Sequence, residues 1–161
     1  FNKIIEVNVK EKWVKVQPGV IRDDLNNYLL EYGLMFGPET STANRAMIGG
    51  MVGNNSCGLH SIVWGAVRDH LLEVSAVLSD GSETLFKNEP VDDNNYSGLK
   101  KVIYDGLHNL LSDENNRQLI QHHFPKASVV RRNSGYALDS LTGMQPFSPL
   151  GEPFNLCKLM T

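Results

Sequence analysis

The feature that most constrains the fold is a glycine-rich stretch, which runs from Met47 to Gly58 and places four glycines within ten positions. Because glycine lacks a Cβ atom, the backbone of this stretch can come close to a bulky ligand. The spacing of Ile48, Met51 and Val52 predicts a short helix that packs its apolar stripe on a core and directs its Gly49–Gly50 end outward. The start of a helix suits a pyrophosphate. The alternative is a tight packing turn without a ligand, since neither GxGxxG nor GxxxxGK[ST] is matched.

The composition is that of an ordinary globular protein. The chain has 161 residues, enough for one domain with a real core, of which 41% are hydrophobic and 20% charged. No apolar run approaches the ~20 residues that a membrane-spanning helix needs. A net charge of −3 gives no basic field for nucleic acid. Cys57 and Cys157 lack metal-ligand spacing and are expected to be reduced thiols, as in a cytoplasmic protein without an export signal.

Hydrophobic periodicity predicts an α+β fold, with a mostly antiparallel sheet flanked by helices. Alternating residues predict one hairpin over 4–16 and a second over 70–86 that turns at Asp80–Gly81. Helical patterns cover residues 21–32, 96–111, 119–124, 137–141 and 154–160. Residues 59–69 carry too many turn residues for a simple core element and are expected to form a wall around a site. The adjacent His122 and His123 point to different helix faces, which favours a solvated helix end over a metal site.

The residues alone offer no convincing catalytic group, so a cofactor is expected to carry any chemistry. The hydroxyls of Thr40–Thr42 either donate to a phosphate or cap the next helix. The pair Arg131 and Arg132 either holds an anion or forms surface ion pairs.

An ordered series of motifs across the chain resembles the FAD-linked oxidase family, which includes D-lactate dehydrogenase, the glycolate oxidase flavoprotein subunit and D-2-hydroxyglutarate dehydrogenase. The matching residues are Val16–Val20, Leu25–Asn26, Gly33–Leu34, Phe36–Pro38, Ser41–Thr42, Ile48–Ser56, Gly65 and Leu78–Gly81. Residues 131–139 and 154–156 are similar to the long bacterial dehydrogenases that carry a fused iron–sulfur region.

This resemblance implies that residues 1–161 are part of a PCMH-type FAD-binding domain, namely its second subdomain, without the first subdomain and the substrate domain. The implied function is hydride transfer from a D-2-hydroxy acid to noncovalently bound FAD. Any iron–sulfur cluster would lie in a fused region outside this chain, and any contact with a membrane would come through electron acceptors. The implied cofactor-binding residues are Pro38, Ser41, Thr42, Gly49, Gly50, Gly53, Asn54, Asn55 and Gly65.

Three further expectations concern single side chains. Arg131 and Arg132 are candidates for a substrate carboxylate. Glu39 stands where aspartate is commoner in the family and brings a negative charge near the site. His60 is expected to be structural or solvent-facing rather than a base or a flavin attachment point. Two rival functions remain open, a non-enzymatic α+β interaction module and a nucleotide-binding module without redox chemistry.

Overall fold

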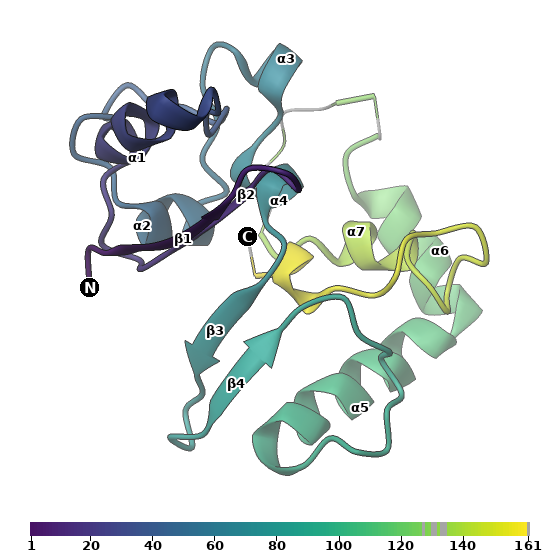
Figure 1. Cartoon of the computed structure of the whole chain (residues 1–161). Coiled ribbons are helices and arrows are strands. Elements are labelled where there is room, and N and C mark those ends of the chain that lie inside the picture. Colours follow the sequence, from purple (N-terminus) through teal and green to yellow (C-terminus); the bar gives the residue numbers. More distant parts are fainter. Residues whose placement is uncertain (127, 130–131, 133–134, 161) are drawn as a thin grey trace. The chain divides into compact units, whose positions relative to one another are not determined.

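The structure is a computed structural model of the chain, and it describes residues 1–160 except 127, 130, 131, 133 and 134. It divides into two compact units, Phe1–His70 and Leu71–Met160. Each unit has its own apolar core and its own two-stranded antiparallel sheet (Figure 1). Length alone predicts one domain. The chain instead has two separate cores, because each hairpin packs against apolar residues of its own half of the sequence.

The first unit opens with the predicted hairpin. Strand β1 (Ile4–Asn8) pairs with β2 (Trp13–Val16), with Val7 opposite Val14 and a bulge between Ile4 and Glu6. The hairpin is followed by α1 (Arg22–Leu29), which tightens into the 3₁₀ turn η1 (Leu30–Tyr32). Gly33 then ends the helix at φ 65°, a left-handed conformation that favours glycine.

Three short helices complete this unit. They are α2 (Ile48–Gly53), α3 (Ser61–Trp64) and α4 (Val67–His70). The core combines α1, α2 and α4, and its buried residues are Val20, Leu25, Leu29, Ile48, Met51 and Val67. The predicted glycine-rich helix is therefore present, and its apolar stripe faces the core as expected. Helix α3 and most of α4 fall in residues 59–69, and their expected role as a wall around a site stays a prediction. His70, predicted as the start of a strand, is the last residue of α4.

The second unit builds its core between a hairpin and a long helix. Strands β3 (Val74–Val77) and β4 (Glu83–Phe86) pair antiparallel, with Val74 opposite Phe86. Helix α5 (Gly98–Ser112) brings Tyr104, which stacks on Phe86 with ring centroids 6.3 Å apart. Helix α6 (Glu114–His123), helix α7 (Leu138–Thr142) and the 3₁₀ turn η2 (Leu156–Lys158) follow. The β3–β4 hairpin and α5 are drawn in teal and green in Figure 1.

A polar cluster lies inside this second core. The Tyr104 hydroxyl donates to the Glu89 carboxylate at 2.5 Å, and the Lys100 ammonium lies 2.8 Å from the same oxygen atom. Lys100 also sits 4.6 Å from the centroid of the Tyr96 ring, a cation–π geometry. Burial and the bond to Glu89 raise the pKa of Tyr104 far above its ordinary value. The cluster thus gives both oxygens of a largely buried carboxylate a partner.

The predicted α+β class and antiparallel pairing are confirmed, although the strands form two small sheets rather than one. Helix α6 begins five residues before the predicted start at 119, because the Asp113 side chain caps it by accepting from the Asn115 N–H at 2.9 Å. The predicted helix over 154–160 is only the turn η2. Phe154, Asn155, Leu156 and Cys157 are all buried there, so no polar face is left for a surface helix.

Candidate functional site

The start of helix α2 is hydrogen-bonded to the segment that precedes α1. The Ile48 N–H donates to the Val20 carbonyl and the Gly49 N–H to the Pro18 carbonyl, both at 2.8 Å. Two of the amides at the helix start therefore already have acceptors within the protein. This differs from the expectation that the Gly49–Gly50 end is open as a whole, because only Gly50 of the two is exposed.

Two glycines of the stretch are required by packing. A Cβ atom on Gly49 would lie 2.6 Å from the Pro18 Cβ and 3.2 Å from its Cα. A Cβ atom on Gly58 would overlap the Glu39 side chain and approach its carbonyl oxygen to 2.8 Å. Real Cβ atoms do not come this close to other heavy atoms. These glycines are thus explained by the fold itself, which is the packing-turn alternative for this part of the stretch.

Gly50 and Gly53 have no such explanation. Both are exposed, and a Cβ atom on either would find no heavy atom within 4 Å. They lie one turn apart on α2, and the exposed Asn54 follows directly. The result is a stretch of helix backbone that side chains leave uncovered. Such a surface lets a large ligand approach the main chain directly.

The two asparagines after the helix have different surroundings. Asn55 is only 4% exposed and adopts φ 43°, and its Oδ1 accepts the Arg68 N–H of α4 at 2.9 Å. Asn54 is exposed, and its Nδ2 donates to the Ser56 hydroxyl at 3.3 Å. We expected both carboxamides to serve a diphosphate. The structure gives Asn55 a structural contact at the start of α4 and leaves Asn54 at the surface.

The loop before the helix carries the predicted Pro38, Ser41 and Thr42. Pro38 is buried, and Ser41 is exposed. The Thr42 hydroxyl lies 3.0 Å from the Thr40 hydroxyl, and the Thr42 carbonyl accepts the Ala46 N–H at 2.8 Å. This local pairing closes a tight turn over residues 41–45. The N-cap of α2 is Met47 and no side chain caps this helix, so the predicted capping role of the hydroxyls is wrong. Their role as phosphate donors stays a prediction.

Gly65 is needed for a local reason. It adopts φ 69°, and a Cβ atom there would lie 2.5 Å from the Asp69 Oδ2. The same oxygen accepts the Ala66 N–H at 2.8 Å and so caps α4. The expected closeness of Gly65 to a cofactor remains a prediction.

Sequence reasoning missed a contact between Glu39 and His60. The Glu39 Oε1 lies 2.7 Å from the His60 Nδ1 and 3.2 Å from the His60 backbone N–H. The pair joins the loop before α2 to the turn after it, and the imidazole side chain stays 66% exposed. The only sequence signal was Gly58, because its missing side chain makes room for Glu39. The expectation of a structural or solvent-facing His60 agrees with this position.

Of the two arginines predicted for a substrate carboxylate, Arg131 lies outside the described residues. Arg132 belongs to the second unit, where its Nη2 lies 2.5 Å from the Asp139 Oδ2 and its Nη1 donates to the Pro125 carbonyl at 2.8 Å. Its guanidinium thus already has a carboxylate partner in this structure. All predicted cofactor-binding residues, in contrast, belong to the first unit.

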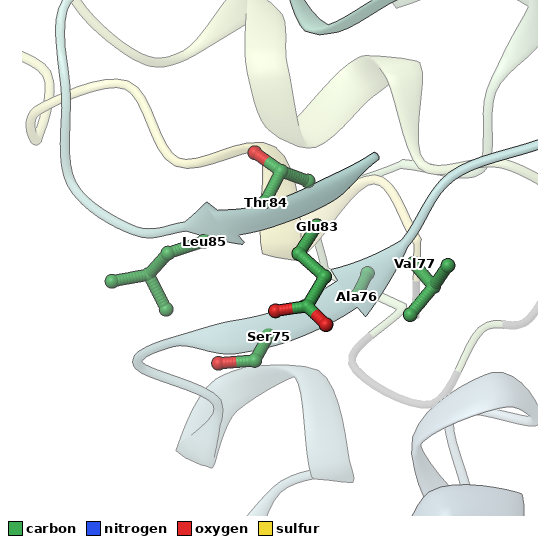
Figure 2. A pocket seen from close by; sticks show the side chains of 6 residues that line it. All are labelled: Ser75, Ala76, Val77, Glu83, Thr84 and Leu85. Atoms are coloured by element: carbon green, nitrogen blue, oxygen red, sulfur yellow. The ribbon is translucent and has the colours of Figure 1, made fainter. Parts of the chain in front are cut away.

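A shallow hollow elsewhere holds none of the predicted residues. It lies on the β3–β4 hairpin and is lined by Ser75, Ala76, Val77, Glu83, Thr84 and Leu85 (Figure 2). Within the described residues, no group of three or more His, Cys, Asp or Glu side chains is arranged to hold a metal ion. The described helices are also all too short or too polar to cross a bilayer. The uncovered backbone of α2 is therefore the strongest candidate site.

Comparison with known proteins decides the family. Residues 1–85, more than half of the chain, match the family described as FAD binding domain. The chain belongs to this FAD-binding domain family. The whole first unit, with α2 and both flanking loops, lies inside the matched region. The predicted resemblance to FAD-linked oxidases is thereby confirmed.

Curated relatives of this FAD-binding domain are dehydrogenases and oxidases. The chain is 37% identical to D-2-hydroxyglutarate dehydrogenase of Escherichia coli (strain K12) over 163 aligned residues, which cover 100% of the chain and 15% of that protein. It is 35% identical to the enzyme of the same name from Pantoea ananatis, over 99% of the chain and 15% of that protein. Glycolate oxidase subunit GlcD of Bacillus subtilis is 34% identical over 50% of the chain and 17% of its own length. The chain thus spans about a sixth of the length of these relatives.

Proposed function

We propose that the chain is the FAD-binding part of a flavin-dependent dehydrogenase that oxidises a D-2-hydroxy acid. The observation that carries this proposal is the uncovered face of α2. Gly50 and Gly53 lack side chains where nothing in the fold excludes one, and they lie within the region that matches the FAD family. Relatives named D-2-hydroxyglutarate dehydrogenase supply the substrate class.

The residues present fit the diphosphate end of such a cofactor. The backbone at Gly50 and Gly53 allows close approach, and Ser41 and Asn54 expose neutral hydrogen-bonding groups on the same unit. Neutral donors hold phosphate charges without a metal ion when they are prearranged. Bound FAD would supply a flavin ring that accepts a hydride from the substrate α-carbon. The protein's part in this region is to bind and orient the cofactor.

Two titratable side chains near α2, Glu39 and His60, contact each other at 2.7 Å and hold two loops together. A general base has to reach the substrate hydroxyl within hydrogen-bond distance. We therefore expect the catalytic base to be a residue other than Glu39 and His60, and we expect FAD to be held noncovalently. The iron–sulfur cluster, the cytoplasmic location and the absence of nucleic-acid binding stay predictions from the sequence.

The test begins with the purified full-length protein, because the chain spans only about a sixth of the length of its relatives and is expected to be inactive alone. We expect a flavin spectrum, release of the flavin into the supernatant on acid precipitation, and anaerobic bleaching by D-2-hydroxyglutarate, D-lactate or glycolate, with no bleaching by L-2-hydroxyglutarate. Flavin that stays in the acid precipitate would contradict noncovalent binding. Flavin that none of these acids reduces would support a nucleotide-binding module without this redox chemistry. A colourless protein that takes up no added FAD would leave the interaction module as the better reading.

A further inference from the structure

The loop that carries Pro38, Ser41 and Thr42 is attached at its far end to the start of α1. The Arg22 backbone N–H donates to the Ala46 carbonyl at 2.9 Å, and the Asp23 N–H donates to the Ala43 carbonyl at 3.2 Å. The first amides of a helix have no acceptor within the helix itself. Here the tight turn over residues 41–45 supplies acceptors, so the helix start and the turn fix each other.

The near end of the loop is held by two side chains of the same helix. The Arg22 Nε donates to the Pro38 carbonyl at 3.1 Å, and its Nη2 lies 3.5 Å from the Phe36 carbonyl. The Asn26 Nδ2 donates to the Phe36 carbonyl at 3.2 Å, and its Oδ1 accepts the Phe36 N–H at 2.7 Å. Arg22 and Asn26 are four residues apart, so they lie on one face of α1.

These contacts replace a strand partner. Residues 34–40 belong to no helix or strand, and among the described strands none pairs with them. The backbone polar groups of such a segment need other partners, most of all at the buried Gly37 and Pro38. The Arg22 side chain is only 15% exposed and meets Asp23 Oδ1 at 3.1 Å through its Nη1. The guanidinium thus uses all three nitrogens within the protein, which is the geometry of a carbonyl clamp and not of an open anion ligand.

We propose that Arg22 and Asn26 are positioning residues for the cofactor, which act by holding the Phe36 and Pro38 carbonyls and so presenting the loop over residues 38–42. This inference rests on the proposed FAD binding. A loop that is already ordered before the ligand arrives loses less conformational entropy on binding. Neither side chain has to touch the cofactor for this effect.

The test compares Arg22→Lys, Asn26→Leu and the control Arg117→Lys in FAD-stripped full-length protein. Arg117 is a matched control in the second unit, because its side chain is 18% exposed, its Nη1 donates to the Leu111 carbonyl and its Nη2 pairs with Glu114. We expect Arg22→Lys and Asn26→Leu each to weaken FAD affinity about 10- to 100-fold, the effect of losing one or two partly buried hydrogen bonds. Arg117→Lys should bind FAD like the unsubstituted protein. Amide hydrogen exchange at Phe36 should speed up in Asn26→Leu even without FAD.

The outcomes separate this inference from the proposed function. If the unsubstituted protein takes up no FAD, the proposed function fails, and the cofactor-positioning role fails with it. If it binds FAD and both variants match it in affinity, only the positioning role is overturned. Lowered thermal stability with unchanged FAD affinity of the folded fraction overturns it as well. A direct anion ligand would instead tolerate Arg22→Lys, because the charge remains, and would lose affinity in Arg22→Met with a changed salt dependence.

Discussion

Gly49 and Gly50 are adjacent in the sequence, yet adding one methyl group to each should have opposite effects. In Gly49→Ala the new Cβ would lie 2.6 Å from the Pro18 Cβ and 3.2 Å from the Pro18 carbonyl oxygen. Overpacking of this kind costs about 1–3 kcal/mol, and the gain in helix propensity offsets up to ~1 kcal/mol of it. We expect Gly49→Ala to lower the free energy of unfolding by about 1–2 kcal/mol.

In Gly50→Ala the new Cβ meets no heavy atom within 4 Å. The substitution should raise the free energy of unfolding of the FAD-free protein by about 0.5–1 kcal/mol, because alanine favours the helix and restricts the unfolded chain. The same methyl group should weaken FAD binding by about tenfold or more, since a loss of ~1.4 kcal/mol is enough for that. Gly50→Val should weaken it further and give colourless protein.

Urea unfolding followed by circular dichroism gives the stability, and titration of the stripped protein gives the FAD affinity. Gly106 provides the matched control, because it is an exposed glycine inside α5 whose Cβ would also meet nothing within 4 Å. Gly106→Ala should stabilise the protein and leave FAD binding unchanged. The reasoning is refuted if Gly50→Ala binds FAD as well as Gly106→Ala does, or if it destabilises the FAD-free protein.

Three further predictions concern other parts of the chain. Burial raises the pKa of the Cys157 thiol from 9.0 to about 11, so the stability that the neutral thiol contributes is complete below about pH 9 and is lost as the pH rises towards 11. The difference in free energy of unfolding between the unsubstituted protein and Cys157→Ala should therefore decrease by up to ~2 kcal/mol between pH 8 and pH 11. A difference that stays constant over this range would contradict the raised pKa. Tyr104→Phe should lower the free energy of unfolding by about 1.5–3 kcal/mol, because it removes a partly buried hydrogen bond to a carboxylate. Tyr96→Phe, which loses a bond to the Pro90 carbonyl, should lower it by about 1 kcal/mol. Equal losses in urea unfolding would argue against a special role for the Glu89 cluster. His60→Ala should keep its flavin and most of its turnover, and a fall of ~100-fold in kcat would instead make His60 a catalytic base.

The sequence predicted the elements whose signals are local. Alternation over residues 4–16 and around Asp80–Gly81 depends on near neighbours, and both hairpins are present. The spacing of Ile48 and Met51 also predicted the short helix α2 and its buried face. Helix α6 was placed too late because its start depends on the Asp113 cap, while the apolar pattern begins only further along.

What the sequence did not predict depends on contacts between distant positions. Gly49 and Gly50 look alike in the sequence, and only the approach of Pro18 separates a packing glycine from an open one. The contact between Glu39 and His60 joins residues 21 positions apart and has no periodic signal. The division into two cores likewise follows from which apolar residues meet in space, which one sequence without periodic repeats does not reveal.

The placement of the tryptophans has a practical consequence for spectroscopy. The sequence contains two of them, Trp13 and Trp64, and both lie before the boundary at His70. Helices α5 and α6, with 15 and 10 residues, are the longest helices described and lie beyond that boundary. Indole fluorescence therefore monitors only the amino-terminal unit, whereas far-ultraviolet ellipticity reports on both units, with the largest contribution from α5 and α6. Two optical probes on unlabelled protein are thus enough to tell whether the halves melt in one cooperative step or in succession.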